Sequence, residues 1–191
     1  MNNLTDYDLW ASLKSGDLKA FSTLFKIYYP LLHNYGLKLS NYNEQLTEDC
    51  LQEFFLYVYE HKENLANLNS IKPYLYVSFR RHLFREIKKA SKMVNYDKNE
   101  NFFVEINFST EDLIIQQEID ALKHGNLVKF LNELPSRQKE VLYLKYYSDL
   151  NIDEIAKVLE INYQSVLNLI HKGIKKLRQN TSLNELLKDI I

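Results

Sequence analysis

The sequence predicts an all-α protein: two small helical domains joined by a flexible linker, the C-terminal one a helix-turn-helix. Three observations predict this class. The 191 residues include only three prolines and four glycines, too few for a fold dense in turns. Apolar residues recur at helical spacing along most of the chain. The hydrophobic fraction of 46% is ordinary for a chain that buries a core.

The first predicted domain spans residues 1–92 and begins with core helices. Helical periodicity runs up to Pro30 and resumes after it in the stretch LLHNYGLKL. Thr47 is the expected N-cap of the next helix, with two acids in its first turn. One face of that helix is apolar at the spacing i, i+3, i+4, i+7, with Leu51, Phe54, Phe55 and Val58.

The last helix of this domain is predicted to be amphipathic with a positive outer side. Pro73 suits its first turn. The apolar stripe assigns Tyr76 and Phe79 to the core, whereas Tyr74 falls on the basic side and is expected to be functional. The cations opposite the stripe are Arg81, Arg85, Lys88 and Lys89.

A linker is predicted over residues 93–109, where helical periodicity fails. The second domain is predicted over 110–180, followed by a tail of residues 181–191. We expect Thr110 to open a helix that Gly125 closes. Ser136 is a candidate cap for the helix after Pro135.

The helix-turn-helix is predicted from two short helices and a three-residue turn at residues 160–162. Asn151 and Glu154 have the spacing of a capping box. The inward residues of the first helix are Ile152, Ile155, Ala156 and Leu159, and those of the second are Val166, Ile170, Gly173 and Leu177. The opposite face of the second helix carries Gln164, Asn168, His171, Lys172 and Lys175.

The net charge of −1 hides two basic islands. Residues 71–93 hold seven Lys/Arg against one acid, and residues 163–180 hold four against none, whereas residues 1–70 have five against nine. Amides and cations on a helix face suit base edges and phosphates in the major groove. Cations beside aromatic rings suit opened DNA. The alternative for the second island is a solvated charged helix on an ordinary bundle, and the alternative for the first is that its aromatic residues belong to the core.

Asp49 and Glu53 lie one helical turn apart, which raises the hypothesis of a metal-dependent enzyme acting on nucleic acid. The five histidines are scattered singly, and no glycine-rich phosphate loop is present. We therefore expect an acidic surface that is solvated or faces a partner, no catalytic residue, no metal and no cofactor.

The expected location is the cytoplasm. The N-terminal residues carry acids where a secretory signal carries positive charge, and no apolar run is long enough to enter a membrane. The single cysteine, Cys50, has no partner for an internal disulfide and is expected to pack in the core.

The order of these parts resembles bacterial RNA polymerase sigma factors of the extracytoplasmic-function type within the sigma-70 family. EDCLQEFFLYVYEH is similar to an acidic helix of the family through Asp49, Gln52, Glu53 and Phe54. KPYLYVSFRRHLFREIKK is similar to its promoter-reading helix, and the stretch from LPSRQKEV to KLRQ is similar to its C-terminal helix-turn-helix domain. The resemblance implies a sigma domain 2-like first domain and a sigma domain 4-like second domain.

The resemblance also implies site residues and partners. It assigns core polymerase binding to Asp49, Gln52 and Glu53. Reading of the minus-ten promoter element falls, with the preceding Asn-rich loop, to Tyr74, Arg80, Arg81, Arg85, Lys88 and Lys89. Reading of the minus-thirty-five element falls to Gln164, Ser165, Asn168, His171, Lys172 and Lys175. The implied partners are core RNA polymerase, promoter DNA and an anti-sigma protein.

Two positions depart from the family pattern. Leu167 stands where many members have Arg or Lys, which predicts weaker or shifted minus-thirty-five binding. Glu160 stands where many have glycine, and a left-handed turn there would cost about 1–2 kcal/mol. The alternative to a sigma factor is a helix-turn-helix regulator that binds duplex DNA as a dimer without joining the polymerase.

Overall fold

The structure, a computed structural model, describes residues 5–92, 106–109 and 121–179. All regular elements within these ranges are helices. The chain divides into two compact units, Met1–Asn101 and Phe102–Ile191. The predicted all-α class with two helical domains is confirmed, whereas the predicted domain limits stay predictions. Most of the predicted linker, the helix expected to open at Thr110 and the tail lie outside the described residues.

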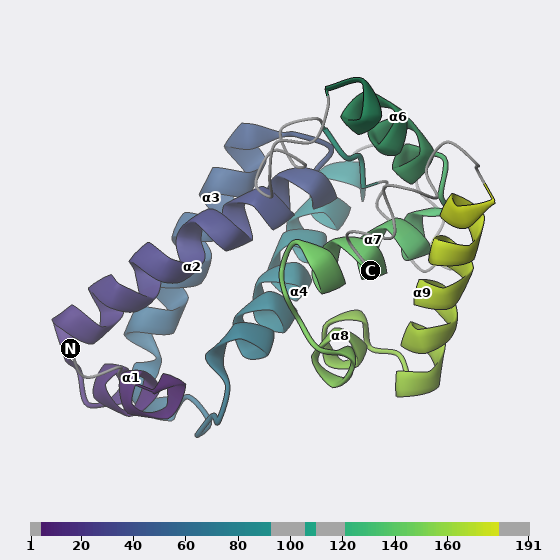
Figure 1. Cartoon of the computed structure of the whole chain (residues 1–191). Helices are drawn as coiled ribbons and strands as arrows, with labels where there is room; N and C mark the ends of the chain where they lie inside the picture. Colours follow the sequence, from purple (N-terminus) through teal and green to yellow (C-terminus); the bar gives the residue numbers. More distant parts are fainter. Residues whose placement is uncertain (1–4, 93–105, 110–120, 180–191) are drawn as a thin grey trace. The chain divides into compact units, whose positions relative to one another are not determined.

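The N-terminal unit is built on three long helices that pack against one another, with a short helix at one end (Figure 1). α1 contacts both α2 and α4. The helices are α1 (Asp6–Lys14), α2 (Leu18–Leu39), α3 (Glu44–Glu60) and α4 (Ile71–Lys92), and a 3₁₀ turn, η1 (Lys62–Asn64), follows α3. Their shared core includes Leu24, Leu32, Tyr35, Leu51, Phe55, Leu75, Phe79 and Leu83.

Gly36 marks the closest approach of α2 to its neighbours. A Cβ at this position would lie 2.6 Å from Cγ2 of Thr47 and 3.0 Å from Cζ of Phe79. Glycine therefore allows α2 to pack directly against α3 and α4. Both predicted core aromatics of α4 are buried, since Tyr76 and Phe79 have exposed fractions of 1% and 0%.

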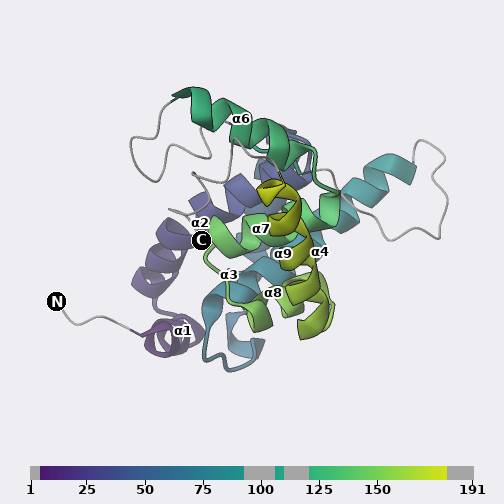
Figure 2. The ribbon, with the colours of Figure 1, turned by 45° about the vertical axis from the view of Figure 1, so that its right-hand side comes forward.

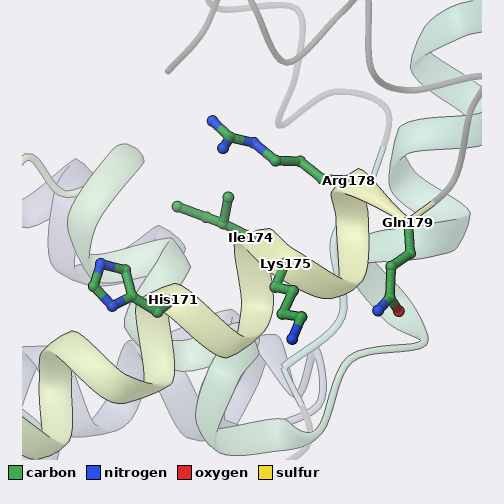
Figure 3. A pocket seen from close by; sticks show the side chains of 5 residues that line it. All are labelled: His171, Ile174, Lys175, Arg178 and Gln179. Atoms are coloured by element: carbon green, nitrogen blue, oxygen red, sulfur yellow. The ribbon is translucent and has the colours of Figure 1, made fainter.

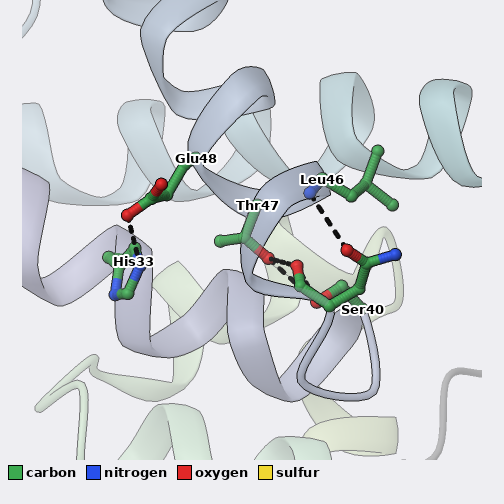
Figure 4. A network of polar contacts seen from close by, with 6 residues as sticks. His33, Ser40, Leu46, Thr47 and Glu48 are labelled. Atoms are coloured by element: carbon green, nitrogen blue, oxygen red, sulfur yellow. Dashed lines mark hydrogen bonds and ion pairs between the residues drawn. The ribbon is translucent and has the colours of Figure 1, made fainter.

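Two local expectations for this unit were wrong. α2 continues through Pro30 as one helix, because the residues on both sides of the proline bury apolar side chains in the same core. The third helix begins three residues before Thr47, since Asn43 caps it by accepting a hydrogen bond from the Leu46 N–H. Thr47 is instead buried, and its hydroxyl bonds to the Asn43 carbonyl and to Ser40 Oγ, each at 2.8 Å (Figure 4).

The C-terminal unit contains four described helices: α6 (Ala121–Asn132), α7 (Ser136–Tyr146), α8 (Ile152–Leu159) and α9 (Tyr163–Arg178). α7 packs against both α8 and α9, and α8 packs against α9, so these three form one cluster (Figure 2). Their buried side chains include Val141, Leu144, Ile155, Val158 and Val166, and Leu150 between α7 and α8 is also buried.

Three details of this unit differ from the sequence-based expectation or extend it. α6 runs through Gly125, because burial of Leu127 and Leu131 outweighs a glycine penalty of about 1 kcal/mol. Ser136 is the first residue of α7, but its side chain makes no capping bond. Phe108, within the predicted linker, is buried in this unit, and its N–H donates to Asn132 Oδ1 at 2.7 Å.

Candidate nucleic-acid interface

The first helix of the predicted helix-turn-helix is fixed by its own cap. Asn151 Oδ1 accepts from the Glu154 N–H and Glu154 Oε2 accepts from the Asn151 N–H, both at 2.9 Å. This reciprocal pair satisfies two backbone donors at the start of α8. The predicted capping box is confirmed. Ile155 is fully buried, whereas Ile152, Ala156 and Leu159 are half-buried.

The turn between α8 and α9 depends on a left-handed residue. Glu160 has φ 55° and ψ 41°, as expected for a position where glycine is common. The Ile161 N–H bonds back to the Ala156 carbonyl at 3.0 Å. Asn162 then caps α9 by accepting from the Ser165 N–H at 2.7 Å. The turn therefore reverses the chain in three residues, as a helix-turn-helix requires.

α9 is strongly two-sided. Its buried positions are Val166, Ile170, Gly173 and Leu177, as the sequence predicts. A Cβ on Gly173 would lie 3.2 Å from Leu142 Cδ1, so the glycine lets α9 pack closely on α7. Packing of this stripe on α7 and α8 orients the opposite face outward.

The outward face of α9 holds five of the six residues predicted to contact the minus-thirty-five element. Gln164, Asn168, His171, Lys172 and Lys175 are all exposed, and Ser165 is half-buried. The Gln164 amide donates to Asn168 Oδ1 at 3.3 Å, which aligns two amides along the helix. Because no acid occurs from the Asn162 cap to the end of α9, this face carries amides and cations without compensating negative charge.

Two features of α9 were missed at the sequence level. Tyr163, its first residue, is 46% exposed, and its position directly after the cap was the available signal. His171, Ile174, Lys175, Arg178 and Gln179 line a hollow at the C-terminal end of the helix (Figure 3). Lys176 is not among the residues that line this hollow. Its Nζ instead donates a hydrogen bond to the Glu133 carbonyl at 2.7 Å.

The basic side of α4 is less uniform than the sequence predicts. Arg81, Arg85, Lys88 and Lys89 are exposed, and Lys89 pairs with Glu86 at 2.7 Å. Arg80 is half-buried, with its guanidinium 4.4 Å from the centre of the Phe84 ring.

Tyr74 was expected on the basic side of α4, but the fold places its ring against Trp10. The ring centres are 5.4 Å apart in an edge-to-face arrangement. Burial of the ring raises the pKa of the Tyr74 hydroxyl above its ordinary value. A role for Tyr74 at DNA remains a prediction, and its structural role is to join α4 to α1.

The predicted polymerase-binding residues lie together on α3. Asp49, Gln52 and Glu53 are all exposed. Glu53 is also 3.2 Å from Nε2 of His82 on α4, a pairing that the sequence does not reveal because the two residues are 29 positions apart. This contact joins the exposed acidic side of α3 to α4.

The fold also gathers groups that the sequence showed only as scattered. His33, Glu44 and Glu48 lie with their ligand-type atoms within 4.8 Å of one another, and His33 Nε2 is 4.0 Å from Glu48 (Figure 4). This is the one such group among the described residues, and it includes neither Asp49 nor Glu53. Among the described residues, Asp49 and Glu53 therefore do not form part of a three-residue group that could hold a metal ion.

The fold and the outward face of α9 define a class of protein: a helical protein with a helix-turn-helix motif whose second helix is suited to bind DNA. Comparison with known proteins narrows the class. Residues 124–177 match the family pattern described as Sigma-70, region 4. The chain is 25% identical over 173 residues to the ECF RNA polymerase sigma factor SigM of Bacillus subtilis, covering 85% of this chain and 96% of SigM.

Two solved structures share the fold. RpoE of Bartonella quintana, in complex with the anti-sigma factor NepR, matches with a TM-score of 0.60 at 17% identity, over 85% of this chain and 96% of that one. CnrH, in complex with the cytosolic domain of CnrY, matches with a TM-score of 0.58 at 16% identity, over 96% and 97%. Residues 124–177 thus carry the region-4 pattern of sigma-70 factors, and the chain as a whole is similar in sequence to extracytoplasmic-function sigma factors. Among the described residues, no helix is both long and apolar enough to span a bilayer.

Proposed function

We propose that this protein joins core RNA polymerase as an alternative sigma factor, directs it to a set of promoters and helps to open them. It is a transcription initiation factor and not an enzyme. The observation that carries the proposal is the outward face of α9, where exposed amides and cations lie on the second helix of a helix-turn-helix within a region-4 match. Such a face can read base edges and neutralise phosphates.

Three surfaces divide the work in this proposal. The α9 face, with Gln164, Ser165, Asn168, His171, Lys172 and Lys175, binds the duplex minus-thirty-five element. The basic side of α4 and the loop before it bind the opened minus-ten element, through Tyr74, Arg80, Arg81, Arg85, Lys88 and Lys89. The exposed groups on α3, Asp49, Gln52 and Glu53, bind the polymerase core. The domain limits proposed for these tasks are 1–92 and 110–180.

The partners follow from this division. They are core RNA polymerase, promoter DNA and an anti-sigma factor that holds the protein inactive. The relatives support the last of these, since RpoE was solved in complex with an anti-sigma factor. We place the protein in the cytoplasm, where transcription occurs in bacteria.

A transcription assay tests the central claim. The full chain, mixed with core polymerase and a promoter carrying a premelted minus-ten element, should yield a defined transcript that core polymerase alone does not produce. The competing function, a dimeric regulator of duplex DNA, is not favoured by the relatives. Tight dimeric binding to duplex DNA, with no transcript and no association with core polymerase, would establish that competitor instead.

The polymerase surface has its own test. Replacing Asp49 and Glu53 together by alanine should weaken binding to core polymerase while leaving affinity for minus-thirty-five duplex DNA unchanged. Glu63→Ala, which removes an exposed acid outside α3, is the matched control and should bind core polymerase normally. Equal core affinity in the double variant and the control would show that the polymerase contact lies elsewhere.

A further inference from the structure

Three side chains of α1 hold the segment that leads into α4. The Trp10 indole N–H donates to the Ala66 carbonyl at 2.8 Å, and Lys14 Nζ donates to Asn67 Oδ1 at 2.7 Å. Asp6 Oδ2 accepts from the Ile71 N–H at 2.9 Å. The bonds join residues 53 to 65 positions apart, and they span the whole loop of residues 65–70.

The bonds from Trp10 and Asp6 are well placed to be strong. Trp10 is only 1% exposed, so its indole N–H is shielded from water and the bond to Ala66 is its means of satisfying that donor. Its ring also supports Tyr74, in the first turn of α4. Asp6 places a carboxylate at the N-terminus of α4, where free backbone N–H groups and the positive end of the helix dipole stabilise an anion. A residue of α1 therefore caps α4.

Between these anchors, the loop presents amides to the outside. Ala66, Asn67 and Asn69 are exposed, while Leu65 is buried and Leu68 half-buried. An Asn side chain offers both a donor and an acceptor, the combination that pairs with the edge of a base. Lys14 donates to Oδ1 of Asn67, which fixes the orientation of this amide. The amide nitrogen of Asn67 is then the group that can donate to a ligand.

We propose that α1 is the positioning element of this loop. Asp6, Trp10 and Lys14 hold it in the shape in which Asn67 and Asn69 meet an unpaired base, and Lys14 orients the Asn67 amide to donate to an acceptor on that base. The inference rests on the proposed function, in which this loop and α4 bind opened minus-ten DNA. If α1 only supported α4 and did not shape the loop, its substitution would leave the preference among the four bases unaffected.

Base discrimination separates the two roles. The assay is binding of the sigma–core polymerase complex to single-stranded minus-ten oligonucleotides that carry each of the four bases at the position most sensitive to substitution. Lys14→Met keeps the aliphatic stem and removes the donor. We expect it to reduce the affinity ratio between the preferred and the other bases by about tenfold, the size of one well-oriented base contact. Trp10→Phe should act in the same direction.

Matched controls come from the same N-terminal unit. Asp6→Ala should lower discrimination, and Asp6→Asn, which keeps an acceptor oxygen, should restore most of it. Glu60→Ala, which removes an exposed carboxylate from the C-terminal end of α3, should leave the ratio unchanged. Lys26→Met, at an exposed position on α2, controls for loss of a lysine charge.

The outcomes are distinct. A reduced ratio in Lys14→Met with an unchanged thermal unfolding midpoint supports the inference. An equal loss of affinity for all four bases, or no loss, overturns it. If Asn67→Ala together with Asn69→Ala also leaves the ratio unchanged, the loop does not read a base and this part of the proposed function falls too. If that double variant lowers the ratio but Lys14→Met does not, only the role of α1 is refuted.

Discussion

The two cationic helices, α4 and α9, reach an outward basic face by different means. The face of α9 follows from periodicity alone, because one buried stripe fixes which residues point away. The face of α4 is modified by neighbours: Tyr74 packs on Trp10, Arg80 lies over Phe84 and His82 approaches Glu53. A helix held along one stripe keeps the pattern of its sequence, whereas a helix contacted from several sides does not.

The two helices also suit different forms of DNA. α9 offers amides and cations in one row, which suits duplex DNA. α4 combines exposed cations with fixed aromatic rings and a loop held by α1, which suits a single conformation of an opened strand.

The largest expected effect concerns the support beneath α4. Gly36→Ala should lower the free energy of unfolding by about 1–3 kcal/mol, because its Cβ would meet Thr47 at 2.6 Å and Phe79 at 3.0 Å inside a packed core. Gly173→Ala is the counterpart in α9. There the nearest atom is the end of the Leu142 side chain at 3.2 Å, and alanine's helix preference of about 1 kcal/mol offsets the contact. Urea unfolding of both variants measures the difference, and equal losses would contradict it.

The next effect concerns the exposed cations of α9. Replacing Lys172 and Lys175 by alanine should reduce the slope of log affinity against log salt by about one to two units for minus-thirty-five duplex DNA. Lys176→Ala removes the same charge from the same helix, but its Nζ is held by the Glu133 carbonyl. We expect a smaller change in slope for that control. Fluorescence anisotropy over a range of salt concentrations gives the slopes, and an unchanged slope in the double variant would mean that another face contacts DNA.

A third effect should be confined to the N-terminal unit at alkaline pH. Burial, with smaller contributions from the Glu86, Glu53 and Asp49 carboxylates, raises the pKa of the Cys50 thiol to about 11. An unfolded thiol ionises near pH 8.5, so above that pH the unfolded state loses a proton that the folded state keeps. Stability should fall by about 1.4 kcal/mol per pH unit until the folded thiol also ionises.

Comparison with Cys50→Ala isolates this contribution, because the variant lacks the thiol but keeps every other titrating group. The free energy of unfolding of the parent should fall more steeply with pH than that of the variant between pH 8.5 and 10. Below pH 8 the two profiles should run parallel, since the thiol is then neutral in both states. Parallel profiles across the whole range would show that Cys50 keeps an ordinary pKa.

The smallest expected effect is a gain in stability at the turn before α9. Glu160→Gly should raise the free energy of unfolding by about 1 kcal/mol, because glycine adopts φ 55° without steric cost. Glu160→Ala keeps the Cβ and should bring no such gain, which separates the backbone effect from loss of charge. Thermal unfolding of the three proteins is sufficient. A gain in the alanine variant equal to that of glycine would assign the effect to the carboxylate.

The helix-turn-helix was predicted almost entirely from sequence because its determinants are local. The capping box of Asn151 and Glu154 and the left-handed Glu160 involve residues at most four positions apart. The stripe of α9 follows the helical repeat. Two local signals failed because tertiary packing outweighed the local cost. α2 continues through Pro30 with buried side chains on both sides of the proline, and α6 continues through Gly125 into the buried Leu127 and Leu131.

The candidate site divides in the same way. The exposure of the α9 face and of Asp49, Gln52 and Glu53 could be predicted from helical spacing. The packing of Tyr74 on Trp10 and the approach of His82 to Glu53 could not, since each joins residues that are distant in sequence. Nothing in the sequence pattern indicates that α1 bonds to the loop before α4.

The position of Trp10 gives the protein an internal optical reporter. It is the single tryptophan among the 191 residues, so excitation at wavelengths that tyrosine does not absorb observes this one ring. The indole is shielded from water and bonded to the Ala66 carbonyl. Separation of α1 from the loop would expose the ring to water and shift its emission to longer wavelengths. Intrinsic fluorescence of the unlabelled protein would therefore report the loss of contact between α1 and this loop.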